Sequence, residues 1–229
     1  MGIQPRRAPS RLVVAVDGGV ATGKSSVCTE VARRLRLPYF NAGLLYRALA
    51  LWCVGERIAL DDADGIAAAA GSYPLTVSLD GGRTTILLMG RDVGDQLKTA
   101  EVGRAVPAVA RHRAVRDIMN GRQRAIVRYA ESAFGGVVID GRDATTVVVP
   151  EADVKILLVA TEEVRARRVG ADEGAAADRD AADASVSDFL RPGPGVAVLD
   201  TSDLDIGELV SRVLACVREK RPDWVRGTD

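Results

Sequence analysis

The sequence predicts an α/β fold, in which buried strands alternate with helices. Short apolar runs at residues 12–16, 136–139, 154–159 and 196–199 have the length and composition of buried strands. Segments with the apolar spacing of helices follow, most clearly at residues 24–36 and 206–220. Two of the strands end in polar turns that contain glycine. Because ligands of open α/β sheets bind outside the carboxyl ends of the strands, a functional site is expected there.

Length and composition restrict the class of protein. A chain of 229 residues can form one sizeable core with a small inserted subdomain. Its 31 lysine and arginine residues balance 31 aspartate and glutamate residues, so no overall charge attracts nucleic acid or an anionic membrane. No apolar run approaches the ~18 residues that cross a bilayer, and residues 1–11 lack the apolar stretch of a signal peptide. We therefore expect a cytoplasmic, monomeric protein that binds neither nucleic acid nor membranes.

The cysteines and the single histidine form no metal-binding or catalytic pattern. Cys28, Cys53 and Cys216 lie far apart in helical segments and have no C-x-x-C spacing, so free, apolar roles are expected. His112 stands between two arginines and is expected on a helix surface. Histidine-based acid–base or zinc chemistry is therefore not expected.

The most specific signal follows the first strand. Its residues are Gly18-Gly19-Val20-Ala21-Thr22-Gly23-Lys24-Ser25, which match the pattern G-x-x-x-x-G-K-[ST] in full. Glycines permit a tight turn whose N–H groups converge, with the following helix N-terminus, on a point that suits a phosphate. Lys24 can follow the β- and γ-phosphates of ATP, and the Ser25 hydroxyl can ligate the bridging Mg²⁺. The stretch therefore predicts a P-loop that binds ATP and Mg²⁺.

The next segments predict a second helix and a hairpin. Residues 39–40 form a short strand, and residues 44–54 a helix whose only cation, Arg47, either reaches the surface or faces an anion. Residues 75–79 and 84–89 flank the turn signal Asp80-Gly81-Gly82 and are expected to form a β-hairpin. A hairpin within a βα pattern indicates a small insertion away from the main sheet.

The segment at residues 93–130 is predicted to be helical, with interruptions near Pro107 and near Asn120-Gly121. It is rich in arginine. Most of these arginines are expected on solvated helix faces, and they are Arg104, Arg111, Arg113, Arg116, Arg122, Arg124 and Arg128.

A second polar turn, Asp140-Gly141-Arg142-Asp143, ends the strand at residues 136–139. It is expected beside the P-loop, and Arg142 between carboxylates favours a functional role over an ordinary turn. The helix at residues 162–169 places Arg165 and Arg168 on one face. Residues 170–195 lose apolar periodicity and are predicted to form a mobile loop, either a functional lid or a disordered segment, before the last strand and helix.

With these motifs, the chain resembles the bacterial cytidylate kinases, the CMP/dCMP kinase branch of the nucleoside monophosphate kinases. Residues 41–47 are similar to the family's D-[ST]-G-A-x-Y-R, and residues 165–168 to its R-A-x-R-R. Residues 140–152 are similar to its D-G-R-D-x-G-T-V-V-F-P-D-A. Four further segments occur in the same order as in the family: Leu97 to Val102, Val115-Arg116, Gln123-Arg124 and residues 199–202.

The resemblance implies a P-loop fold with a five-stranded parallel sheet in a single P-loop kinase chain. It implies a core at about residues 11–60 and 134–229, an acceptor-binding insertion with the hairpin at about 61–133, and a lid at about 170–195. It implies catalytic roles for Lys24, Arg142 and Arg168, and a Mg²⁺ ligand at Ser25. It implies acceptor contacts from Arg47, Arg116, Asp140, Arg142 and Asp143. The implied ATP contacts are Gly18, Gly19, Val20, Ala21, Thr22, Gly23, Lys24, Ser25, Ser26 and Arg165.

The departures from the family pattern bear on the acceptor. Asn41 and Ala42 stand where the family has an aspartate and a hydroxyl residue, and the lid segment is short and acidic. The resulting prediction is an ATP-dependent kinase of a pyrimidine nucleoside monophosphate, CMP or dCMP, whose discrimination against UMP and AMP is loosened. The alternatives are a kinase for a different or modified acceptor and a catalytically impaired nucleotide-binding pseudokinase.

Overall fold

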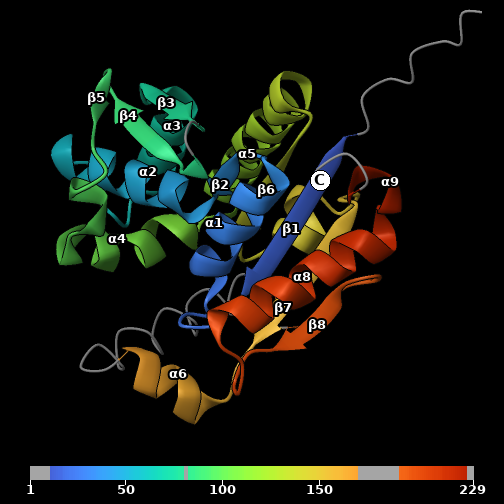
Figure 1. Cartoon of the computed structure of the whole chain (residues 1–229). Helices are drawn as coiled ribbons and strands as arrows, with labels where there is room; N and C mark the ends of the chain where they lie inside the picture. Colours follow the sequence, from blue (N-terminus) through green and yellow to red (C-terminus); the bar gives the residue numbers. More distant parts are fainter. Residues whose placement is uncertain (1–10, 80–81, 170–190, 226–229) are drawn as a thin grey trace, which may run out of the picture.

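A computed structural model describes residues 11–79, 82–169 and 191–225 and contains two sheets (Figure 1). The larger sheet has five strands in the order β2-β6-β1-β7-β8, and every pairing in it is parallel. This confirms the predicted α/β fold and the five-stranded parallel sheet. The strands are β1 (Leu12–Gly18), β2 (Tyr39–Asn41), β6 (Gly136–Gly141), β7 (Val154–Val159) and β8 (Ala197–Asp200).

Helices cover both faces of this sheet. Alternate residues of a strand point to opposite faces, and in these strands both sets of side chains are apolar and need to be buried. In β1, Leu12, Val14 and Val16 belong to the buried cluster that α1 and α8 complete. Val13 and Ala15 belong to the cluster on the opposite face, with α2 and α5. Other helices of the chain are α1 (Lys24–Leu35), α6 (Glu162–Val169), α8 (Ile206–Lys220), α9 (Pro222–Val225) and the π-helical turn η3 (Ala144–Val148).

The predicted hairpin is present and belongs to a smaller antiparallel sheet, in the order β3-β4-β5. Val77 of β3 pairs with Ile86 of β4. The two-residue strand β5 and the helix α3 were not predicted. The alanine-rich sequence of α3 lacks clear apolar periodicity, although Asp62 caps its first turn. The elements of this region are α2 (Gly43–Gly55), α3 (Ala63–Ser72), β3 (Leu75–Ser78), β4 (Thr85–Leu88), β5 (Arg91–Asp92), η2 (Gln96–Lys98), α4 (Ala100–Ala110) and α5 (Arg113–Phe134).

The predicted interruptions near Pro107 and near Asn120-Gly121 are wrong. Pro107 lies inside α4, and α5 runs without a break through residues 120 and 121, so the two helices separate at residues 111–112. Tertiary packing outweighs local propensity here, because α5 keeps one continuous buried face that includes Val115, Met119 and Val127.

Four of the seven arginines in this region are exposed, as expected, and they are Arg104, Arg111, Arg113 and Arg128. The others make tertiary contacts. Arg122 donates to the Ala70 and Gly71 carbonyls, and Arg124 donates to the Val147 and Val148 carbonyls.

Thr84 attaches the smaller sheet to the edge of the larger one. Its hydroxyl accepts from the Asn41 N–H at 2.7 Å and donates to the Tyr39 carbonyl at 2.9 Å. Thr84 thereby satisfies two backbone groups on the free edge of β2. Two predicted features lie partly outside the described residues: the lid at residues 170–190 and the hairpin turn at residues 80–81. Within the described ranges, no helix has both the length and the hydropathy needed to span a membrane.

Asp153, just before β7, joins the C-terminal helices to the start of β1. Its carboxylate accepts from the Val13 N–H at 2.8 Å and from Arg221 Nη1 at 2.6 Å. We expect Asp153→Ala to lower the free energy of unfolding by about 1–3 kcal/mol, because both donors lose their acceptor. Urea unfolding followed by circular dichroism measures the effect. Asp223→Ala, which removes the other, more exposed carboxylate paired with Arg221, is the control; an equal loss in both variants would contradict the role of Asp153.

Candidate active site

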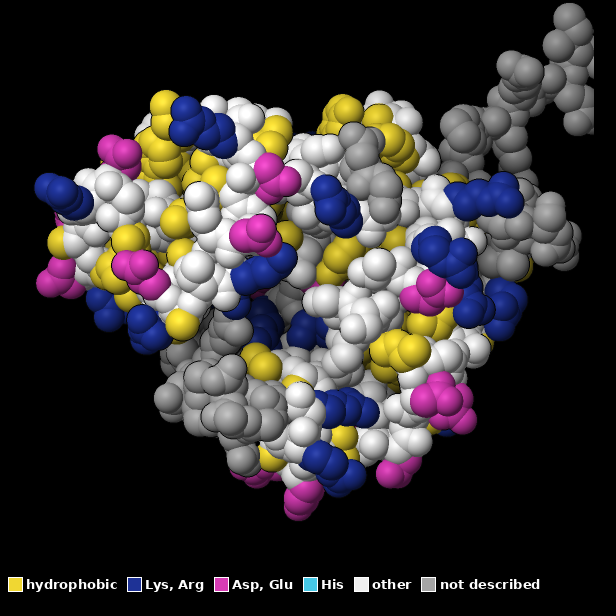
Figure 2. Space-filling view, turned by 60° about the vertical axis from the view of Figure 1, so that its left-hand side comes forward, with side chains coloured by type: hydrophobic (Ala, Val, Ile, Leu, Met, Phe, Trp, Pro, Cys, Tyr) yellow, Lys and Arg dark blue, Asp and Glu magenta, His cyan; other side chains and the backbone are white. Residues whose placement is uncertain are grey.

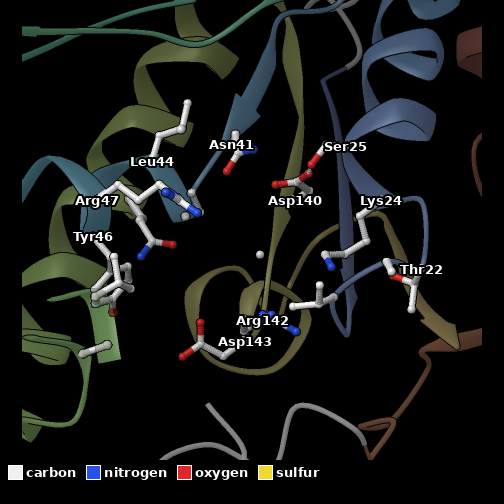
Figure 3. Close-up of a pocket in the computed structure, with 18 of the residues that line it drawn as sticks. Thr22, Lys24, Ser25, Asn41, Leu44, Tyr46, Arg47, Asp140, Arg142 and Asp143 are labelled. Carbon is white, nitrogen blue, oxygen red and sulfur yellow. Dashed lines mark hydrogen bonds between the residues drawn. The ribbon is translucent and has the colours of Figure 1, made fainter. Parts of the chain in front are cut away.

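A cavity of about 400 Å³ lies at the carboxyl ends of β1, β2 and β6. Figure 2 shows a hollow on this face with lysine and arginine side chains inside it. In Figure 3, the P-loop residues Thr22, Lys24 and Ser25 face Arg47 across the cavity. The second polar turn, with Arg142 and Asp143, lies between them (Figure 3). The two predicted motifs and the helices α2, α4 and α5 therefore contribute residues to one site.

Backbone geometry explains two glycines of the P-loop. Gly23 precedes α1 with φ of 86°, a left-handed conformation that glycine adopts without strain. A Cβ at Gly18 would lie 2.5 Å from the Leu158 carbonyl oxygen, so only glycine fits between β1 and β7 at this point. The loop also closes on itself, because the Thr22 hydroxyl and Lys24 Nζ both donate to the Gly19 carbonyl, at 2.9 and 2.7 Å.

Three arginines hold the P-loop through its carbonyl oxygens. Arg142 Nη1 donates to Gly18 at 2.9 Å, Arg165 Nε to Val20 at 3.0 Å, and Arg168 Nη1 to Ala21 at 3.2 Å. Arg168 also donates to the carbonyl of Thr201, at the end of β8. With these carbonyls engaged, the loop keeps its N–H groups available to an anion.

Asp140 is a buried carboxylate beside the P-loop. Its Oδ2 accepts from the Ser25 hydroxyl at 2.9 Å and from the Tyr39 hydroxyl at 2.7 Å. Burial raises the pKa of Asp140, and the positive charge of Lys24 opposes this rise. The Tyr39 hydroxyl in turn accepts from Asn41 Nδ2 at 3.2 Å.

Ser25 and Asp140 fit a magnesium ion. A hydroxyl and a carboxylate that already lie within hydrogen-bond distance supply the hard oxygen ligands that Mg²⁺ prefers. Both line the same cavity as Lys24, so the ion would lie beside the phosphates that the loop receives.

The opposite wall of the cavity carries a buried ion pair. Arg116 of α5 donates to Asp143, and the two side chains are only 14% and 9% exposed. Burial raises the pKa of Asp143, and the Arg116 charge opposes this shift. From the sequence, Arg47 was expected either to reach the surface or to face an anion. In the structure it is half-buried, lines the cavity and donates to the Leu97 carbonyl at 2.6 Å.

The structure brings most of the predicted site residues together. Those that line the cavity are Val20, Ala21, Thr22, Gly23, Lys24, Ser25, Ser26, Arg47, Arg116, Asp140, Arg142 and Asp143. Gly18, Gly19, Arg165 and Arg168 lie behind this wall, at the strand end and on α6. The cavity is also lined by residues to which the sequence analysis gave no site role, including Leu44, Tyr46, Val106, Ala110 and Gln123.

Asp17 is a further residue to which sequence reasoning gave no role. It is 2% exposed, and its carboxylate accepts from the Ala144 N–H, the Thr145 N–H and the Thr145 hydroxyl at 2.9, 2.8 and 2.6 Å. These contacts fix the turn immediately after Asp143. A carboxylate near the end of an otherwise apolar strand was the available signal, because a buried charge requires specific partners.

Comparison with known proteins gives consistent relatives. The model of the cytidylate kinase family matches residues 14–219. The cytidylate kinase of Rhodococcus opacus (strain B4) is 37% identical over 225 residues, covering 92% of this chain and 96% of the relative. The cytidylate kinase of Streptomyces avermitilis is 39% identical over 226 residues, covering 94% and 96%.

Among solved structures, an uncharacterized protein from Eubacterium ventriosum ATCC 27560 has a TM-score of 0.50 and 11% identity, over 92% of this chain and 99% of its own. That likeness concerns the fold alone. The family is carried by the match over residues 14–219 and by relatives that are 37% and 39% identical along nearly the whole length. The chain therefore belongs to the cytidylate kinase family.

Proposed function

We propose that this protein transfers the γ-phosphoryl group of ATP to the 5′-phosphate of CMP or dCMP, which gives ADP and the pyrimidine nucleoside diphosphate. One observation carries the proposal within the family. A single cavity is lined by residues 20–25 of the P-loop, and also by arginines and a buried carboxylate. Such a cavity can hold a donor and an acceptor phosphate together.

On the donor side, the loop N–H groups and Lys24 bind the β- and γ-phosphates. Ser25 and Asp140 hold Mg²⁺, which neutralises charge on the phosphates when bound. Tyr39 keeps the Asp140 carboxylate in place through its hydroxyl. Arg165 and Arg168 support ATP binding by holding the loop carbonyls of Val20 and Ala21.

On the acceptor side, Arg47 and Arg142 bind the 5′-phosphate, because guanidinium groups match phosphate oxygens. Arg116 and Asp143 contact the pyrimidine, where a carboxylate can accept from the exocyclic amine of cytosine. The insertion at about residues 61–133 forms the acceptor-binding part, which is consistent with the origin of Arg116 in α5. Catalysis then rests on aligning the two phosphates and neutralising the transferring charge, since little covalent chemistry is asked of the protein.

The test is ADP release, coupled to a spectroscopic assay, with CMP, dCMP, UMP, AMP and cytidine at one ATP concentration. We expect turnover with CMP and dCMP and none with cytidine. Ala42 is buried in the cavity wall and has no hydroxyl, so the preference for CMP over UMP should fall well short of many thousand-fold.

Each alternative has a distinct outcome in this assay. ATP binding without turnover of any monophosphate would indicate a pseudokinase. Efficient turnover of a different monophosphate alone would indicate another acceptor. Phosphorylation of cytidine would contradict the roles given to Arg47 and Arg142.

A further inference from the structure

Gln123 has a buried side-chain amide in the cavity wall, without a hydrogen-bond partner among the described residues. Its side chain is 1% exposed and lines the cavity. Within residues 11–79, 82–169 and 191–225, no group forms a hydrogen bond with this side-chain amide. Buried amides normally have partners, because an unsatisfied donor or acceptor destabilises the folded state. A ligand in the cavity would satisfy this amide.

The surroundings of Gln123 favour a base over a phosphate. On α5, Gln123 lies seven residues after Arg116, about two helical turns along the same face. The same cavity wall contains the apolar side chains of Leu44, Val106 and Ala110, which suit the faces of an aromatic ring. A neutral amide offers donors and an acceptor but no charge, and the phosphate already has arginines.

We propose that the Gln123 side-chain amide is a further substrate-binding residue of this site, which binds the ring edge of the acceptor pyrimidine. The inference rests on the proposed function. Arg116 lies near the N-terminal end of α5 and pairs with Asp143, the last residue of the second polar turn. Gln123 lines the cavity about two turns further along α5. Gln123 therefore contacts a part of the base that the ion pair leaves open.

Cytosine and uracil differ in the hydrogen-bonding groups at this edge of the ring, so replacing the Gln123 amide with a carboxylate should affect the two bases differently. The N3 and O2 atoms of cytosine both accept hydrogen bonds, so the amide N–H₂ of Gln123 serves cytosine. In uracil, N3 carries a hydrogen and donates. An amide can serve either base by rotating, whereas a carboxylate at the same position accepts only and favours uracil.

The experiment compares Gln123→Leu and Gln123→Glu with the unmodified protein for CMP, dCMP and UMP. We expect Gln123→Leu to lower kcat/KM for CMP and UMP by about 10-fold each, with the ATP dissociation constant unchanged. We expect Gln123→Glu to lower the CMP-to-UMP ratio of kcat/KM by about 10-fold or more. The dCMP-to-CMP ratio should stay constant in both variants, because the sugar is not involved. Calorimetric dissociation constants for CMP and UMP, measured without ATP, should change in parallel.

Asn120→Leu is the matched control. Asn120 is a buried amide on the same helix, with an unpartnered Oδ1, and it does not line the cavity. This variant should leave the CMP-to-UMP ratio within about 2-fold of the unmodified protein, whatever it does to stability.

Three results would overturn the inference: an unchanged CMP-to-UMP ratio in Gln123→Glu, an effect confined to the dCMP-to-CMP ratio, or an equal shift in Asn120→Leu. If a variant is too unstable for steady-state assays, its dissociation constants for CMP and UMP are measured by calorimetry at low temperature. Absence of turnover with every pyrimidine monophosphate in the unmodified protein would instead contradict the proposed function.

Discussion

We expect Lys24→Ala to lower kcat by about 10³-fold or more with CMP as acceptor, because loss of one cation at the transferring phosphate has effects of this size. Lys24 lines the cavity and bonds to the Gly19 carbonyl, so its ammonium group lies within the loop that would receive the phosphates. The measurement is steady-state ADP release at saturating ATP, Mg²⁺ and CMP. Far-ultraviolet circular dichroism should remain unchanged, since the side chain is not part of the apolar core.

Lys98→Ala provides the matched control for Lys24. The Lys98 side chain is 78% exposed and pairs with an exposed carboxylate, so its loss should leave the rate unchanged. Turnover of Lys24→Ala within a few-fold of the unmodified protein would show that the donor phosphates bind elsewhere.

The second large effect is expected at Asp17. Asp17→Ala removes the acceptor for three donors at once, all of them buried, at Ala144 and Thr145. We expect the free energy of unfolding to fall by about 2–4 kcal/mol, because these buried N–H and O–H groups would have neither their acceptor nor water as a hydrogen-bond partner. We also expect kcat/KM for CMP to fall by about 10²-fold, since Asp143 immediately precedes the released turn.

The control for Asp17 uses the same residue type at the end of another strand. Asp200 ends β8, is exposed and accepts from the Ser202 N–H at 2.9 Å. Asp200→Ala should cost well under the Asp17 effect in urea unfolding. Equal losses in the two variants, or full activity in Asp17→Ala, would contradict the role of Asp17 in holding the second polar turn.

Much of the fold could be predicted from the sequence because its signals are local. The apolar runs of β1, β6 and β7 are short and buried on both faces, and the terminal helix has its predicted bounds, Ile206–Lys220. The interruptions expected near Pro107 and residues 120–121 were wrong because propensity was read without the packing that holds α4 and α5 together.

The sequence by itself determined the P-loop, the second polar turn and their meeting at the carboxyl ends of adjacent parallel strands. Each motif is contiguous in the chain, and the α/β pattern places strand ends at one edge. Only the tertiary structure decided which groups complete the site. Asp17 and Thr145 are 128 residues apart, and Tyr39 and Asp140 are 101 apart. Nothing in the local sequence shows that Gln123 is buried in the cavity wall. Burial, which depends on how distant segments pack, turns such side chains into hydrogen-bonding groups that need a specific partner.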